Sequence, residues 1–543
     1  MCSGRFLCQM NNNSRYPVGP RLVLRADGNA VIGLGHVIRL LALTELVGPI
    51  YTECIFLIQA PTDSILILLH RAGITVAKLP AGPLTAEATQ TVPPLLRPTD
   101  VLVLDGYGFD YTYQTALQPW VARLVCLDDM HIFPFAADLV LNPAGGVSPA
   151  VYTLHKPNAR LLTGPAYAPL RREFQPADKH LRSSDQLPLE NFNPQRATLQ
   201  LLLCLGGADP NYLTRSTATE LLTLQGLAHV HVVVGAAYAN WEALHAWAAD
   251  YADRLTLYQA LSAAELADLM RRCEVAVLTP STISYEYCSV GGGLLLLLLT
   301  ANNQRDLDYF LRKAGLGLPY AVAPNVLTLA EAPRLVNQLR QAQQQYFDGQ
   351  QGQRLYQEFA ALLAPLPPLR LRPVHATDSN QLLVWTNDPT ARQQSFDTAL
   401  VSLPHHEAWL TKQLMQPERY LLLLAEETAT GQQAGLIRFE FSSDKQHITL
   451  SYSLDPAFRG RGWAAGLLLV GTRAALAYWP AATRVVAEVK TNNVASVRAL
   501  QRAGYREVLG SGPTGSCTFV WVAAPQLAPA IRPADMQSPS CML

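Results

Sequence analysis

Short apolar runs alternate with amphipathic helical patterns along the first 340 residues of the chain. In the first half of this region the apolar runs include Leu22–Arg25, Ile55–Ile58 and Val101–Leu104. Turn residues follow each run, and this order predicts parallel strands connected by helices. In the second half we expect strands at Leu201–Leu205, Val230–Val234, Val275–Leu278 and Leu294–Leu299. The pattern therefore predicts an α/β protein that begins with two parallel α/β domains, residues 21–175 and 198–340.

Polar and proline-containing segments divide the chain. Residues 176–197 are polar with several prolines, which is typical of a hinge. Residues 341–369 begin Gln-rich and end in a proline cluster, and we expect a linker there. A third domain follows at 370–523, and its central part predicts a strand, a glycine-rich loop and a helix. We expect an N-terminal extension at 1–20 and a loose tail at 524–543.

The pairing of two α/β domains has a functional implication. Ligands of open α/β sheets bind beyond the carboxyl ends of the strands. Two domains of similar size around a hinge place these ends at a shared cleft. We therefore expect the first two domains to form one enzyme with an interdomain active site.

The composition limits the classes of function. Of the 543 residues, 49% are hydrophobic and 15% are charged, and the 42 Lys and Arg residues equal the 42 Asp and Glu residues. The hydrophobic share excludes a disordered chain, and the lack of surplus positive charge argues against a nucleic-acid-binding surface. The run Leu294–Leu299 is too short to span a bilayer, so we expect a buried strand and no membrane partner.

Cysteine usage and the first residues predict the compartment. The nine cysteines are an odd number, and no pair has Cys-x-x-Cys spacing. We therefore expect neither a disulfide framework nor a zinc site, and we predict no required metal and a reducing, cytoplasmic location. The first twenty residues are polar and lack the apolar segment of a signal peptide.

The segment Arg25–Arg39 contains the first candidate site. Asp27 and a loop with Gly33 and Gly35 follow the strand, and a helix is expected to begin near His36. The glycines permit close backbone approach or positive φ. At a helix N-terminus the macrodipole disfavours the imidazolium form, which leaves His36 neutral and able to act as a general base. A capping or packing histidine beside an ordinary glycine turn explains the same spacing.

A second candidate site follows the strand at Val275–Leu278. Ser281 or Thr282 can cap the next helix, whose free backbone N–H groups form an anion site for a diphosphate. Glu286 lies one helical turn later, on the same face as Thr282, and can accept hydrogen bonds from two ribose hydroxyls. A cap followed by a solvated glutamate is the alternative.

Other polar or glycine residues also follow apolar strands. Asp105 and Asp129 can orient sugar hydroxyls or amides, but aspartate after a strand is equally typical of a turn or a cap. Gly206 and Gly207 are expected to face the same cleft, with a plain strand-to-helix turn as the alternative. The residues alone leave these alternatives open.

A series of motifs in these segments resembles one enzyme family. The run D-G-N-x-x-I-G-L-G-H-V-x-R at 27–39 is followed by Asp105-Gly-Tyr107, Asp128-Asp129, Gly164-Pro-x-Tyr167 with Arg171 and Phe174, Gly206-Gly-Ala-Asp209, Ser281-Thr282 with Glu286, and Asn303-Gln304. Over about residues 21–340 this series resembles the UDP-2,4-diacetamido-2,4,6-trideoxy-β-L-altropyranose hydrolases of pseudaminic acid biosynthesis. Because the motifs occur in the same order, the similarity is specific.

The resemblance implies a two-domain glycosyltransferase-B-like fold and hydrolysis of a nucleotide-linked sugar. It assigns the catalytic base to His36, which would activate water for attack at the anomeric carbon while UDP departs. The residues then expected to bind substrate or UDP are Asp27, Gly33, Gly35, Arg39, Asp105, Tyr107, Asp129, Tyr167, Gly206, Gly207, Ser281, Thr282, Glu286, Asn303 and Gln304.

The third domain contains its own glycine loop. A loop of this kind between a strand and a helix points successive N–H groups at a pyrophosphate. Arg459-x-x-Gly462-x-Ala464, with Asn493-x-x-Ser496 and Ala503-Gly504-Tyr505 downstream, resembles the GCN5-related N-acetyltransferase (GNAT) family over about residues 370–522. The resemblance implies acetyl-CoA as co-substrate, bound by Leu454, Arg459, Gly460, Arg461, Gly462, Trp463, Ala464, Asn493 and Ser496.

The chain departs from this family at one position. Many members have a tyrosine four residues after the serine, as the acid for the departing thiolate, and this chain has Leu500 there. Tyr452, Tyr505, another group or water can take that role, or no acid is needed.

The start of the third domain carries a further similarity. Trp385, with Asn387-Asp388 and Arg392 nearby, resembles the acetyltransferases that modify the 4-amino group of UDP-4-amino-4,6-dideoxy-N-acetyl-β-L-altrosamine. Ribosomal-protein N-terminal acetyltransferases share this feature, and core packing of Trp385 is the simpler alternative.

The two modules together imply consecutive reactions. In pseudaminic acid biosynthesis the acetyl transfer produces the diacetamido sugar nucleotide from which the hydrolase removes UDP. The sequence therefore predicts a bifunctional enzyme that acts on a UDP-linked amino sugar with acetyl-CoA. One alternative is a glycosyltransferase-B-type sugar transferase fused to a peptide or other amine N-acetyltransferase. Another is a non-catalytic sugar-nucleotide-binding unit that feeds the acetyltransferase.

Overall fold

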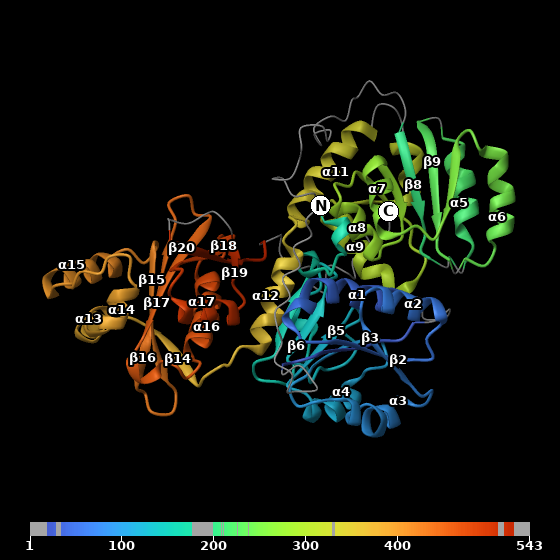
Figure 1. Ribbon diagram of the computed structural model, residues 1–543. Coiled ribbons are helices and arrows are strands. Elements are labelled where there is room, and N and C mark those ends of the chain that lie inside the picture. Colours follow the sequence, from blue (N-terminus) through green and yellow to red (C-terminus); the bar gives the residue numbers. More distant parts are fainter. Residues whose placement is uncertain are drawn as a thin grey trace, which may run out of the picture.

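The computed structural model describes residues 19–28, 34–175, 199–207, 209, 211–224, 226–236, 238–327, 332–508 and 515–525. Within these residues the chain forms three sheets in three separate lobes, which follow the sequence from blue through green to orange in Figure 1. The first two sheets are parallel, and the third is mostly antiparallel. The expected α/β class with parallel sheets is therefore confirmed.

The first sheet has the strand order β3-β2-β1-β4-β5-β6-β7. Its strands are β1 (Leu22–Arg25), β2 (Cys54–Gln59), β3 (Thr75–Leu79), β4 (Val101–Asp105), β5 (Arg123–Leu127), β6 (Leu139–Asn142) and β7 (Arg160–Thr163). The connecting helices are α1 (Gly35–Val47), α2 (Asp63–Arg71), α3 (Leu84–Ala86) and α4 (Tyr111–Leu117). Because β1 pairs with β4 in parallel, the start of α1 lies beside the end of β4.

The second sheet has the strand order β10-β9-β8-β11-β12-β13. Its strands are β8 (Leu199–Cys204), β9 (Leu227–Val234), β10 (Leu255–Gln259), β11 (Val275–Leu278), β12 (Leu294–Leu297) and β13 (Leu318–Pro319). The helices are α5 (Leu213–Leu222), α6 (Trp241–Ala248), α7 (Ala263–Arg272), α8 (Thr282–Ser289), α9 (Arg305–Lys313), α10 (Ala323–Val326) and α11 (Ala332–Tyr346). The leucine run forms a buried parallel strand as predicted, but the strand ends at Leu297, and Leu299 is 41% exposed.

The prediction of a linker at 341–369 is wrong for most of that segment. Its glutamines complete α11 and begin α12 (Gln351–Leu363). Glutamine is a good helix former, and Leu355 and Phe359, one turn apart on α12, are fully buried in the core of the first domain. Gln357 exchanges two hydrogen bonds with the backbone of Val522 in the third domain. In Figure 1, α12 accordingly lies between these two domains and joins them.

The third sheet has the strand order β14-β15-β16-β17-β18-β20-β19. Its strands are β14 (Leu369–Pro373), β15 (Tyr420–Glu427), β16 (Gln433–Phe441), β17 (His447–Leu454), β18 (Arg484–Lys490), β19 (Arg506–Val508) and β20 (Ser516–Val522). Its helices are α13 (Ser379–Thr386), α14 (Pro389–Gln394), α15 (Leu403–Leu414), α16 (Trp463–Tyr478) and α17 (Val494–Arg502). The parallel pairing of β17 with β18 ends at Leu450 and Ala487, so the two strands separate beyond that point.

Some sequence predictions concern residues outside the described part. The expected hinge at 176–197 lies there, as do Gly33 and most of the expected extension at 1–20 and tail at 524–543. A search of the described helices finds none with the length and apolar character needed to cross a bilayer.

Candidate active sites

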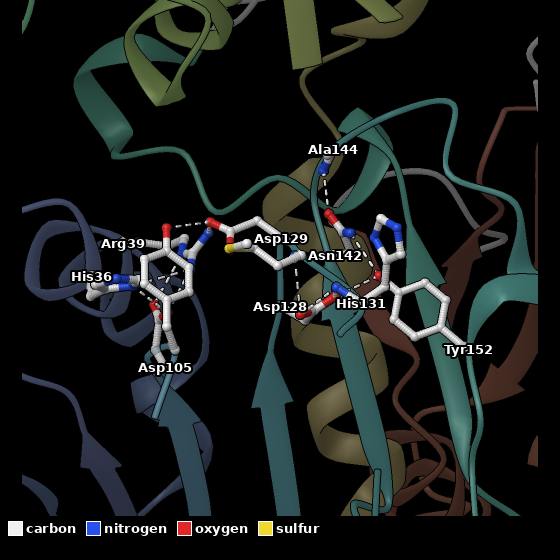
Figure 2. Close-up of polar contacts among 11 residues, drawn as sticks. His36, Arg39, Asp105, Asp128, Asp129, His131, Asn142, Ala144 and Tyr152 are labelled. Carbon is white, nitrogen blue, oxygen red and sulfur yellow. Dashed lines mark hydrogen bonds and ion pairs between the residues drawn. The ribbon is translucent and has the colours of Figure 1, made fainter. Parts of the chain in front are cut away.

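His36 forms a close pair with a buried carboxylate. It is the second residue of α1, and its Nδ1 lies 2.7 Å from Oδ1 of Asp105, the last residue of β4 (Figure 2). A carboxylate oxygen only accepts hydrogen bonds, so Nδ1 carries a proton, and in the neutral ring the free lone pair belongs to Nε2. The pair therefore provides both a base and a group that orients it.

Arg39, one turn further along α1, holds the same carboxylate. Its Nε donates to Oδ2 of Asp105 at 2.9 Å and its Nη2 donates to Oδ1 at 2.5 Å. Nη1 lies 3.3 Å from Oδ2 of Asp129, which also accepts from the Tyr107 hydroxyl at 3.4 Å. Burial raises the pKa of Asp105, but Arg39 and His36 outweigh this effect and the pKa lies below its usual value. The carboxylate is thus ionised at neutral pH.

A cleft between the first two domains opens onto this group. The cavity measures ≈ 220 Å³. The first domain lines one side of it with Gly35, His36, Arg39, Tyr107 and Asp129, and the 143–144 and 168–170 segments also contribute. The second domain lines the other side with Pro280, Ser281, Thr282, Tyr285, Gln304, Asp306 and Leu307. Two predicted groups of residues, far apart in sequence, therefore meet at one cavity.

The N-terminus of α8 forms the far wall of this cleft. Ser281 occupies the N-cap position but makes no side-chain capping bond, and its hydroxyl lies 3.2 Å from that of Thr279. The predicted side-chain cap is therefore wrong for Ser281, because the hydroxyl is turned toward Thr279. The backbone N–H groups of the first turn of α8 are left without a side-chain acceptor at Ser281, which is the arrangement that favours an anion.

Glu286 is more enclosed than the sequence indicates. It is 4% exposed, and Arg171 donates to its Oε1 from Nη2 at 2.8 Å and from Nε at 3.1 Å. Burial raises the pKa of Glu286, and Arg171 only partly offsets this. The alternative of a solvated glutamate is wrong. Contact of Glu286 with a ribose stays a prediction, and the carboxylate that would make this contact is paired with Arg171.

Several predicted binding residues lie apart from the residues that line the cavity. Asp27 accepts from Arg25 and from the backbone N–H of Gln59. Tyr167 packs against the core of the first domain and α12. The neighbouring pair Gly206 and Gly207 follows β8, with φ +100° at the first and a close backbone contact to Gly235 at the second.

Gln304, from the predicted Asn303-Gln304 pair, lines the cleft. The Gln304 side chain accepts from the backbone N–H groups of Thr300 and Ala301, which fixes the loop before α9. The side chain of Asn303 lies outside the described residues.

Two cleft residues were not predicted from the sequence. The Tyr285 hydroxyl donates to the carbonyl of Pro143 at 3.0 Å and accepts from the Gly145 N–H at 3.2 Å, so it connects the two domains beside the cavity. Asp306 lines the same cavity from the first turn of α9. The indication in the sequence is that each lies within three positions of a predicted motif, Ser281-Thr282 or Asn303-Gln304.

A second polar network supports the corner that carries Asp129. Asp128 accepts from the backbone N–H of His131 at 3.0 Å and from the Tyr152 hydroxyl at 2.8 Å, and Asn142 donates to that hydroxyl (Figure 2). This network joins the end of β5 to the end of β6. Asp128 therefore has a structural role, which leaves Asp129 beside the cleft.

The glycine loop of the third domain has the backbone that the motif requires. Gly460 and Gly462 have φ +72° and φ +81°, and Gly462 is the N-cap of α16. The side chain of Arg459 is already paired with Asp388 at 2.8 Å and donates to the carbonyl of Leu454 at 3.0 Å. Arg461 lies over the ring of Phe458. The loop therefore offers backbone N–H groups, and Arg459 has a structural partner.

The later motif of the third domain caps a helix. Asn493 accepts from the backbone N–H of Ser496 at the start of α17, and the hydroxyl of Tyr452 lies 3.0 Å from that of Ser496. Tyr505 is 1% exposed and its hydroxyl is bonded to Thr472, so it is an unsuitable acid. Leu500 is fully buried in the same core. Tyr452 is half-buried where β17 and β18 separate, and it remains a candidate for the acid of the acetyl transfer.

Trp385 is a core residue, as its simpler interpretation predicts. It is 1% exposed, and its Nε1 donates to Asp455 Oδ2 at 2.8 Å. Asp455 begins the glycine loop, so this bond and the Asp388–Arg459 pair attach α13 and α14 to the loop. Among the described residues there is no group of three or more His, Cys, Asp or Glu side chains placed to hold a metal ion.

Residues 368–506 match the family model for the acetyltransferase (GNAT) domain. The C-terminal part of the chain is therefore a GNAT acetyltransferase domain, and the match supports N-acetyl transfer with acetyl-CoA as co-substrate.

One curated relative matches more of the chain. "Uncharacterized protein MJ1062" from Methanocaldococcus jannaschii is 23% identical over 301 residues, which is 54% of this chain and 58% of the relative. The chain thus spans little more than half the length of the curated relative that it matches.

Solved acetyltransferases resemble a shorter part of the chain. Spermidine N-acetyltransferase from Vibrio cholerae in complex with CoA and spermine is 16% identical, with 28% of this chain and 95% of that chain covered and a TM-score of 0.26. Aminoglycoside acetyltransferase AAC(6')-Ib in complex with coenzyme A is also 16% identical, with 28% and 94% covered and a TM-score of 0.25. Likenesses with such TM-scores carry no further conclusion.

Proposed function

We propose that this chain is a bifunctional sugar-nucleotide enzyme. Residues 370–523 transfer an acetyl group from acetyl-CoA to the 4-amino group of UDP-4-amino-4,6-dideoxy-N-acetyl-β-L-altrosamine. Residues 21–340, a glycosyltransferase-B-like module, then hydrolyse UDP-2,4-diacetamido-2,4,6-trideoxy-β-L-altropyranose to UDP and the free sugar. The motif series of the first two domains and the GNAT match of the third support this assignment.

One observation carries the hydrolase half of the proposal. His36, which is held from behind by Asp105, and the N-terminus of α8 line opposite sides of one interdomain cavity. The first supplies a base for water, and the second supplies N–H groups for a diphosphate, with no need for lysine or arginine.

The bond changes of the hydrolysis follow from this arrangement. His36 Nε2 accepts a proton from water while the water oxygen forms a bond to the anomeric carbon. The bond between that carbon and the diphosphate oxygen breaks, and UDP leaves with the electron pair. The amides of α8 stabilise the charge that develops on the diphosphate. Asp105 stabilises the imidazolium formed on His36.

The experiment is product analysis by mass spectrometry and NMR after adding the UDP-4-amino sugar and acetyl-CoA to the full chain. The expected products are CoA, UDP and the free diacetamido sugar. His36→Ala should stop UDP release while UDP binding and acetyl transfer persist. His70→Ala, at an exposed position on α2, is the matched control and should behave as wild type.

Other outcomes would reject parts of the proposal. Near-wild-type UDP release by His36→Ala would reject the role of His36. UDP release only after addition of a sugar acceptor would identify a sugar transferase. Acetylation confined to peptide N-termini would reject the sugar-nucleotide substrate of the third domain.

A further inference from the structure

The guanidinium of Arg39 is held by two protein carboxylates. It is buried in α1, with Nε and Nη2 on the two oxygens of Asp105 and Nη1 toward Asp129. The two-donor edge formed by Nε and Nη2, which could otherwise match a phosphate, is therefore taken by Asp105. Arg39 lines the interdomain cavity, as a substrate-binding residue would, but its two-donor edge faces Asp105.

The position of Arg39 relative to His36 indicates a different role. Nη2 of Arg39 lies 3.4 Å from Nδ1 of His36, and both groups share Oδ1 of Asp105. The two donors fix the carboxylate in the plane that His36 needs. The positive charge of Arg39 also offsets the negative charge of Asp105, which would otherwise favour a permanent imidazolium.

The other charged or titratable groups around His36 contribute less directly. Tyr107 contacts the imidazole edge-to-face, with ring centroids 4.9 Å apart. Asp129 is partly paired with Arg39, and Asp128 is bonded within its own network. Asp306 faces the cavity from α9 across the cleft. Arg39 and Asp105, by contrast, lie within hydrogen-bond distance of His36.

We propose that Arg39 is a positioning residue, which orients Asp105 against His36 and balances its charge so that His36 remains a neutral base. This inference rests on the hydrolase function proposed above. In this role Arg39 acts on the reaction only through Asp105 and His36 and does not touch the sugar nucleotide.

The test compares Arg39→Met and Arg39→Lys with wild type by two measurements on the full chain. The first is an NMR titration of the His36 ring, assigned with His36→Gln. The second is the pH dependence of UDP release. Arg21→Met is the matched control, because Arg21 makes a similar buried two-donor contact to Asp100 at the opposite end of β4.

The expected results follow from the loss of one positive charge. In Arg39→Met the titration midpoint of His36 moves to higher pH by about one unit or more, and the acidic limb of the rate profile moves with it. In Arg39→Lys the charge remains, so the midpoint stays near wild type while kcat falls by roughly 10²-fold, because the carboxylate loses its two-donor contact. KM should stay within about twofold in both variants, since neither loses a contact to substrate. Arg21→Met should leave the midpoint unchanged.

The proposal is overturned if KM rises while the His36 midpoint stays constant, because that result assigns Arg39 to substrate binding. It is also overturned if Arg21→Met moves the midpoint as much as Arg39→Met, which would indicate a general loss of structure. If Arg39→Met does not fold, the titration and kcat of Arg39→Lys decide alone. The NMR titration of His36 does not require turnover. If the wild-type chain releases no UDP, the proposed function is rejected, while the titration still tests the effect of Arg39 on His36.

Discussion

His36 Nδ1 and Asp105 Oδ1 are 2.7 Å apart, although 69 positions separate the two residues in sequence. The contact arises because β1 and β4 are parallel neighbours: α1 begins just beyond the end of β1, and Asp105 ends β4. The carboxyl edge of the sheet thus assembles a base and its orienting carboxylate. Asp105 therefore holds a candidate catalytic group, a role that neither interpretation of the sequence, a sugar contact or a turn residue, included.

The first prediction concerns that carboxylate. Asp105→Asn should lower kcat for UDP release by roughly 10²- to 10⁴-fold, because an amide no longer fixes the proton on Nδ1 or stabilises the imidazolium. The control is Asp100→Asn, because Asp100 is also buried, directly precedes β4 and is paired with Arg21. This variant should lower stability without the loss of kcat. Steady-state kinetics and thermal unfolding of both variants check the prediction. A kcat for Asp105→Asn equal to that of Asp100→Asn would contradict it.

The strands were the part of the fold most accessible from the sequence. Each apolar run, such as Val101–Leu104 or Val275–Leu278, is buried on both faces of a parallel sheet, which leaves a continuous hydrophobic pattern. The His36–Asp105–Arg39 arrangement was less accessible, because it depends on which strands are neighbours. Hydrophobic periodicity gives the type of an element and not its neighbours in the sheet.

The errors also have physical reasons. The Gln-rich composition of 341–353 indicated a linker, but spaced apolar residues such as Leu355 and Phe359 dock the following helix onto the first domain. Ser281 or Thr282 was expected to cap α8, yet Ser281 holds the N-cap position with its hydroxyl toward Thr279. In both cases a tertiary or local contact outweighed the average behaviour of the residue type.

The second prediction concerns the acid of the acetyl transfer. Burial raises the pKa of Tyr452, with Ser496 acting in the opposite direction, so the hydroxyl holds its proton at neutral pH. Tyr452→Phe should lower kcat of acetylation roughly 10²-fold if this proton goes to the departing thiolate. Stopped-flow detection of free CoA measures the rate.

The control for this experiment is another tyrosine of the same domain. Tyr505→Phe also removes one hydroxyl, but that group is buried and bonded to Thr472. It should cost about 1 kcal/mol of stability and leave kcat unchanged. Equal kcat values for the two variants would remove Tyr452 from consideration and leave water as the proton donor.

The third prediction concerns the glycine loop before α16. Gly462 has φ +81°, and an added Cβ would lie 3.3 Å from Pro365. Gly462→Ala should therefore strain the loop by about 1–2 kcal/mol. If the loop moves to relieve this strain, affinity for acetyl-CoA falls by about tenfold, because the N–H groups no longer point at one pyrophosphate. Isothermal titration calorimetry with acetyl-CoA measures the change.

Gly431 provides a matched control for the backbone effect. It has φ +73° in the turn between β15 and β16, with open space around its Cα. Gly431→Ala should lower Tm by about as much as Gly462→Ala does and leave the affinity for acetyl-CoA unchanged. If both variants bind acetyl-CoA like wild type, the loop is not the pyrophosphate site.

The last prediction concerns the helix that connects the domains. Phe359 on α12 is fully buried in the core of the first domain, so Phe359→Ala should destabilise that domain by about 3–5 kcal/mol. Urea unfolding measures the loss of stability. Hydrogen exchange in α1 and α12 shows whether this loss occurs in the first domain. Gln345→Ala, exposed on α11, is the control and should change stability by less than about 0.5 kcal/mol. Because Gln357 on the same helix holds β20 of the third domain, loosening α12 should also raise exchange in β20. Unchanged exchange in β20 would mean that the third domain keeps its position without α12.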